Sequence, residues 1–179
     1  MTKTSDIFEV ADKVTCPPDQ VFKNQDFEFL LTTGGHLVED DAQYLDFMNL
    51  LKKIGETRFF VKENIGATRT NRKLPFEATF SVNSDLKEFD AKIREFDEHF
   101  GMMISHWFIH GQSKKWGIYI AEFPTINIIG CTGELADSFR NVFKIEGNGY
   151  EQESQLLLNE LKLIKDPKER NRFFQNHKI

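Results

Sequence analysis

The chain has 179 residues and a formal net charge of −5 at pH 7. This length fits one domain, and the acidic balance argues against a general nucleic-acid-binding protein. The chain contains 18 Phe but only two Trp and three Tyr. Because Phe carries no polar group, we expect most of this aromatic surface to form a Phe-rich core.

The first half of the chain alternates between strand and helix patterns. Residues 1–24 show no sustained periodicity, so we expect an irregular N-terminal segment there. Strands are predicted over residues 26–33, 58–65 and 76–83. The last of these alternates apolar and polar side chains, which is typical of a strand with one solvated face. A helix is predicted over residues 40–54, and Gly55 supplies its stop.

The clearest helix in the sequence covers residues 86–100. Large apolar side chains recur three or four positions apart on one stripe: Leu86, Phe89, Ile93, Phe96 and Phe100. Asn83 or Ser84 can cap the start of this helix, and Gly101 can cap its end. Burial of each Phe stabilises it by roughly 1.5–3 kcal/mol, whereas each i,i+4 ion pair contributes a few tenths. The apolar stripe therefore fixes the helix.

The second half begins with two segments that are apolar on both faces. Residues 102–110 and 116–123 predict central strands joined by a hairpin loop, and a further strand follows at residues 125–129. Three helices are then expected. The last of them starts at Asp166-Pro167, where Glu169 completes a predicted capping box.

This order of elements predicts an α+β two-layer sandwich. Consecutive strands with short loops form a mainly antiparallel sheet of about five to six strands, with helices packed on one face. We expect an α+β domain over residues 25–146. The segment 1–24 precedes it, and a C-terminal helical extension over residues 150–179 packs on the same domain.

The cysteines and the apolar segments predict the compartment. Cys16 and Cys131 lie far apart and form no CxxC pair, so we expect free thiols, although one disulfide is arithmetically possible. No segment has the length and apolar content of a signal peptide or a membrane-spanning helix. The sequence thus predicts a cytoplasmic protein without membrane association.

His106 and His110 form the first candidate site. On a strand they share one face, but their Cα atoms would be roughly 13 Å apart, which is too far for one metal ion, so we predict no metal and no cofactor. Glu122 interrupts the next apolar strand and could form an acid/base pair with either histidine. The alternative interpretation is two ordinary histidines on the less-buried sheet face and a strand-end carboxylate in solvent.

Cys131, Thr132 and Gly133 form a second candidate site where a strand runs into a helix. Such a junction can present backbone N–H groups to an anion and can activate a thiol. The spacing fits neither a phosphatase loop, nor a P-loop, nor a dinucleotide fingerprint. In the alternative interpretation there is no anion site: Thr132 caps the helix, Gly133 forms the turn, and Cys131 is a small apolar side chain in the core.

Two basic segments remain as candidate contacts. A loop holds Arg69 and Arg72, which could bind an anion, and the last helix interleaves basic residues with Phe173 and Phe174. Acidic neighbours reduce the net positive charge of both segments, so we do not expect nucleic-acid binding. Phe173 and Phe174 either pack back on the domain or contact a protein partner or a second copy of the chain.

Because no catalytic template fits, the leading hypothesis is a non-enzymatic, cytoplasmic protein-binding domain, for example an acidic inhibitor-like or adaptor protein. The first alternative is a small-molecule-binding protein or hydrolytic enzyme that uses His106, His110 and Glu122 on the sheet face. The second alternative is an anion site at Cys131.

Overall fold

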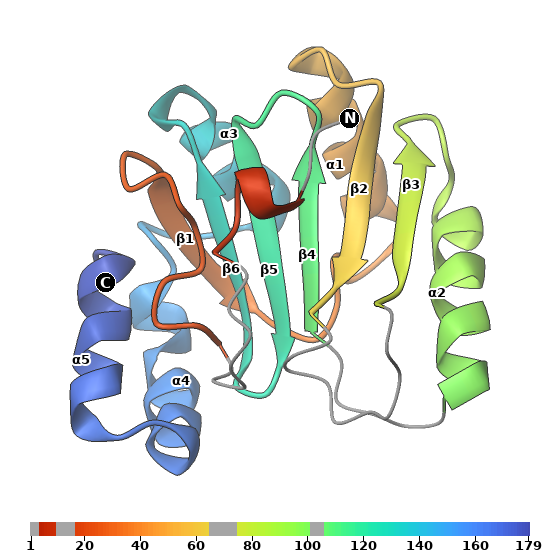
Figure 1. The fold of residues 1–179 in the computed structure, drawn as a ribbon. Helices are drawn as coiled ribbons and strands as arrows, with labels where there is room; N and C mark the ends of the chain where they lie inside the picture. Colours follow the sequence, from red (N-terminus) through yellow and green to blue (C-terminus); the bar gives the residue numbers. More distant parts are fainter. Residues whose placement is uncertain (1–3, 10–16, 65–74, 101–105) are drawn as a thin grey trace.

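The computed structural model describes residues 4–9, 17–64, 75–100 and 106–179. Within these residues, six strands form one antiparallel sheet in the order β1-β6-β5-β4-β2-β3 (Figure 1). The strands are β1 (Glu28–Thr33), β2 (Arg58–Glu63), β3 (Glu77–Ser81), β4 (His106–Gly111), β5 (Trp116–Glu122) and β6 (Thr125–Cys131). The predicted mainly antiparallel sheet is confirmed.

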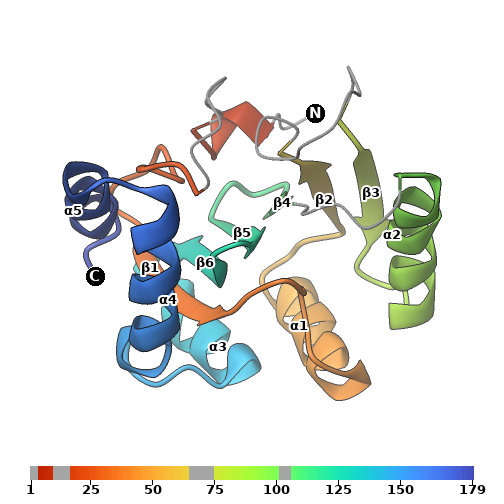
Figure 2. The ribbon, with the colours of Figure 1, turned by 90° about the horizontal axis from the view of Figure 1, so that it is seen from below.

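Three helices cover one face of the sheet, which we call the helix face (Figure 2). They are α1 (Asp41–Lys53), α2 (Leu86–Phe100) and α3 (Gly133–Phe143). The sheet contributes alternate side chains to this core, among them Val61, Trp107, Ile109, Ile118, Ile120 and Ile129. Since one layer of helices packs on one layer of strands, the α+β sandwich is confirmed.

Local signals explain the start of α2. Asp85 is the side chain that caps it, because its Oδ1 accepts a hydrogen bond of 2.8 Å from the Glu88 backbone N–H. The prediction that Asn83 or Ser84 caps this helix is therefore corrected. Of the predicted stripe, Phe89 is buried, while Leu86 and Ile93 are half-buried against the core. Gly101 and the side chains of Phe96 and Phe100 lie outside the described residues.

The N-terminal segment covers part of the other sheet face, which we call the opposite face. Phe8 and Phe22 pair in an isolated β-bridge, with ring centroids 4.9 Å apart. They lie over Gly117 and Gly130, which are cross-strand partners. A Cβ added at Gly117 would be 2.7 Å from Phe8, so the two aromatic rings fill the space that these glycines leave.

The helices α4 (Tyr150–Ile164) and α5 (Pro167–Asn176) also pack on the opposite face. The predicted capping box at the start of α5 is confirmed. Phe173 is fully buried in the core of its own chain, and Phe174 packs beside it. Of the two predicted alternatives, Phe173 therefore packs back on its own domain. None of the described helices has the length and apolar content needed to cross a membrane.

Candidate functional site

The candidate histidines lie on the opposite face, on β4. Each is only 1% exposed, so this is not the less-buried face that the sequence suggested. The ring of His110 stacks on Phe60 with centroids 5.0 Å apart, and its Nε2 lies 3.4 Å from the Thr4 hydroxyl of the N-terminal segment. Its Nδ1 lies 3.0 Å from the carbonyl oxygen of Gly111. His110 is thus enclosed by aromatic rings and backbone.

His106 belongs to a buried polar cluster. Its Nδ1 lies 3.2 Å from the hydroxyl of Tyr119, and the Asn64 side-chain amide donates to that same hydroxyl at 3.2 Å. Burial lowers the pKa of His106 to about 4, and it also lowers the pKa of His110. Both imidazoles are therefore neutral at pH 7.

The strand register separates Glu122 from these histidines. His106 pairs with Ala121 across β4 and β5, and cross-strand partners point to the same face. Because successive residues of a strand alternate, Glu122 leaves the sheet on the helix face. The structure does not bring Glu122 and the two histidines together on one surface.

The second candidate site is also closed. Cys131 is a free, fully buried thiol, and burial raises its pKa to about 12, so it is protonated at neutral pH. Thr132 stands at the N-cap position of α3, but its side chain makes no capping hydrogen bond. At Gly133, an added Cβ would be 3.1 Å from Oε1 of Glu28. A carboxylate of the chain itself therefore lies beside the helix start where an anion would bind.

The remaining candidate residues, Arg69 and Arg72, lie outside the described residues, as does Cys16. In the ranges that the structure does describe, no group of three or more His, Cys, Asp or Glu side chains could hold a metal ion.

The helix face holds a cavity of about 410 Å³. Its floor is formed by β2, β4 and β5, and one wall is formed by α2. The apolar lining residues are Leu37, Val38, Val61, Leu86, Phe89, Ile93, Trp107, Ile109 and Ile120. Polar side chains come from His36 and Glu39, which are exposed, and from Asp90, which is half-buried. An apolar interior with a few polar groups is typical of small-molecule sites.

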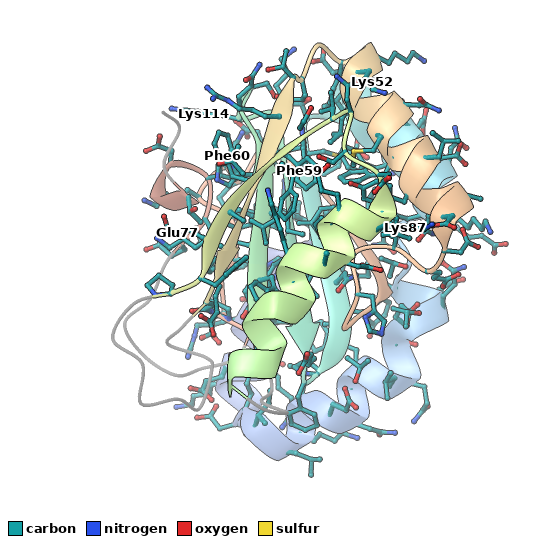
Figure 3. All side chains as sticks on the ribbon, turned by 90° about the vertical axis from the view of Figure 1, so that its right-hand side faces the viewer. Lys52, Phe59, Phe60, Glu77, Lys87 and Lys114 are labelled. Atoms are coloured by element: carbon teal, nitrogen blue, oxygen red, sulfur yellow. The ribbon has the colours of Figure 1, made fainter. Side chains whose placement is uncertain are left out.

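A groove of about 380 Å³ lies next to this cavity, between α1 and the start of α2. Leu86 lines both hollows. Tyr44 and Ser84 line the groove, and their hydroxyl oxygens are buried without a hydrogen-bond partner among the described residues. Lys52 of α1 and Lys87 of α2 also line it (Figure 3).

Neither Tyr44 nor Ser84 was a candidate site residue in the sequence. Tyr44 lies in the helix predicted over residues 40–54, and Ser84 was predicted only as a possible helix cap. A signal was available for Tyr44, because the hydroxyl of a buried Tyr usually needs a hydrogen-bond partner. Comparisons of the chain with protein-family models, curated proteins and solved structures give no match.

Proposed function

We propose that this chain is a non-enzymatic binding protein for a small, mostly apolar molecule, which it holds in the cavity between the sheet and α2. The observation that supports this most directly is the 410 Å³ volume with its apolar lining. Sites for small molecules commonly have volumes of about 300–1,000 Å³ and a few polar groups that orient the ligand.

The volume indicates the size of the ligand. An apolar cavity of about 150 Å³ accepts benzene, so 410 Å³ has room for roughly 12–16 carbon atoms. The ring of Trp107 and the branched side chains of Ile109 and Ile120 offer a flat and an aliphatic surface to such a molecule. A medium-length alkyl chain or a small ring system fits this description.

Binding is favoured over catalysis by the placement of the titratable groups. The candidate histidines His106 and His110 are buried on the opposite face, with His106 neutral at pH 7. The titratable side chains that line the cavity, His36, Glu39 and Asp90, are exposed or half-buried. General acid–base catalysis needs a group within hydrogen-bond reach of the reacting atom, and the apolar floor supplies none.

The test uses 1-octanol as the ligand and NMR of the two Trp indole N–H groups as the readout. Trp107 lines the cavity, whereas Trp116 packs elsewhere in the core, against Phe47 and Phe139. We expect a saturable shift of the Trp107 signal and a much smaller one for Trp116. No shift of Trp107 up to the solubility limit of octanol would contradict the proposal.

A pair of variants links the shift to the cavity. Ile93→Phe adds volume on the α2 wall and is expected to weaken octanol binding at least tenfold. Ile164→Phe, at a half-buried position of α4 outside the cavity, is the matched control and should bind as the wild type does. Equal binding by both variants would place octanol outside the cavity.

Protein binding is a second proposal, carried by the outer side of α4. Leu156 and Leu163 are 42% and 76% exposed, and their spacing of seven residues puts them on one side of the helix. With a net charge of −5, the chain would suit a basic partner, as an acidic inhibitor or adaptor does. The free thiol of Cys131 supports a cytoplasmic setting for either function.

The test of this second proposal is affinity capture with the wild type and Leu163→Ser in parallel. A basic protein retained by the wild type and lost by the variant supports it. A chain that captures the same proteins with and without Leu163, or that sediments alone as a monomer, counts against it.

A further inference from the structure

We infer that the ligand is an amphiphile, with its apolar body in the cavity and an uncharged, hydroxyl-rich head in the groove between α1 and α2. This inference rests on the proposed small-molecule function. It adds the chemical class of the ligand and the residues that recognise its polar end.

The cavity and the groove share the lining residue Leu86, so a molecule that displaces this side chain can reach both. Leu86 is half-buried and lines the cavity and the groove alike. The rings of Tyr44, in the groove, and Phe89, in the cavity, have centroids 5.9 Å apart. A head group joined directly to an alkyl chain spans this boundary once the Leu86 side chain turns aside.

The groove holds two hydroxyls that the fold itself does not use. Tyr44 is 3% exposed and Ser84 is 6% exposed, and neither hydroxyl has a hydrogen-bond partner among the described residues. Such groups destabilise a folded protein, and native structures keep few of them. Helix capping does not account for Ser84, because Asp85 caps α2. Of the four such buried side-chain atoms among the described residues, these two line the same groove, which favours a ligand that satisfies them.

The charges around the groove favour an uncharged head. Asp41 and Asp85 line it together with Lys52 and Lys87, so the lining carries equal numbers of each sign. A head group rich in hydroxyls can donate to the carboxylates and accept from the ammonium groups, as well as pair with both protein hydroxyls.

The surroundings of Tyr44 disfavour an anion in particular. Burial raises the pKa of Tyr44, and the carboxylates of Glu88, Asp85 and Asp90 raise it further. The hydroxyl therefore stays protonated. A carboxylate or phosphate placed beside it would face the same three acidic side chains and be repelled.

The experiment compares three ligands that share an eight-carbon chain: 1-octanol below its solubility limit, and octyl glucoside and octanoate below their critical micelle concentrations. Binding is followed by the Trp107 indole signal. We expect octyl glucoside to bind at least tenfold more tightly than octanol, and octanoate to bind most weakly. Equal affinities for octanol and octyl glucoside would overturn the inference while leaving the proposed function intact. Failure of octanol to bind would overturn the proposed function as well.

Two variants test the head-group residues. Tyr44→Phe and Ser84→Ala should each reduce the affinity for octyl glucoside toward that for octanol, with octanol binding unchanged. Both should also raise Tm in the absence of ligand, because each removes an unsatisfied buried hydroxyl. Tyr150→Phe, at a half-buried position at the start of α4, is the matched control. Wild-type affinity for octyl glucoside in the double variant would overturn the assignment.

Discussion

Acidification should destabilise this protein well above the pH at which carboxylates titrate, because three of its described histidines, His106, His110 and His177, are buried in the neutral form. His177 shows the reason most clearly. Its Nε2 accepts a hydrogen bond of 3.2 Å from the Val21 backbone N–H, and its Nδ1 lies 2.8 Å from the carbonyl oxygen of Phe173. A proton added to Nε2 would point at the Val21 N–H and remove its acceptor.

The magnitude follows from the difference in pKa between the folded and unfolded chains. Burial lowers the pKa of His177 and of His106 from 6.5 to about 4. As pH falls below 6.5, the unfolded chain takes up these protons first, so the stabilisation is complete above pH 6.5 and is lost toward pH 4. At pH 5 each histidine accounts for a loss of about 2 kcal/mol relative to pH 8. Together they account for about 4 kcal/mol, which is a large part of the 5–15 kcal/mol typical of a domain.

The assay is urea unfolding at several pH values between 5 and 8, a window that avoids most carboxylate titration. His177→Gln should reduce this loss of stability by about 2 kcal/mol, since an amide oxygen can accept from Val21 without titrating. His36→Gln, at an exposed histidine, is the matched control. A wild-type free energy of unfolding that varies by less than about 1 kcal/mol over this window would refute the reasoning.

Three further substitutions test how the sheet is held. Phe8→Ala should lower the free energy of unfolding, measured in urea, by about 3–5 kcal/mol, because this fully buried ring fills the space over Gly117. A loss below about 1 kcal/mol would show that the N-terminal segment does not stabilise the sheet. Glu56→Ala should lower it by about 3 kcal/mol, because the carboxylate accepts from the Trp116 indole at 3.1 Å and from the Gln112 N–H at 2.9 Å, and these donors would be left buried. Asp166→Ala removes the α5 cap and should lower Tm by the equivalent of about 1 kcal/mol, with an unchanged Tm as the contrary result.

The elements that the sequence predicted well are those whose signals are local. The apolar stripe of α2 and the capping box of α5 each lie within a few residues, and both helices form where these signals place them. The central strands β4 and β5 were equally clear, since side chains that are apolar on both faces leave few alternatives.

The N-terminal cover could not be predicted in the same way. The sequence around Phe8 and Phe22 has no helix or strand periodicity. Their positions are set by packing over Gly117 and Gly130, which lie far along the chain. The environment of His110 depends on this cover. Alternation along β4 could show that His106 and His110 share a face, but only the packing of the N-terminal segment shows that the face is closed.

The candidate site was missed for a related physical reason. A hollow is a difference between the volume that the backbone leaves and the volume that the side chains fill, and it has no local sequence pattern. The sequence gives no reason to separate Val61, Ile109 and Ile120 from ordinary core residues. The cavity arises only from their arrangement with α2.

The two faces of the sheet differ in how their space is filled, and this difference supports the proposed ligand site. On the opposite face, glycines at 117 and 130 make room and Phe8 and Phe22 occupy it, while His177 and Val21 satisfy each other's polar groups. On the helix face, α2 leaves volume beside Ile109, and the Tyr44 hydroxyl in the adjoining groove has no hydrogen-bond partner within the described part of the chain. Empty volume and unpaired hydroxyls both lower the stability of a folded protein. Their occurrence on the same face is best explained by a ligand that fills the cavity and forms hydrogen bonds with the hydroxyls.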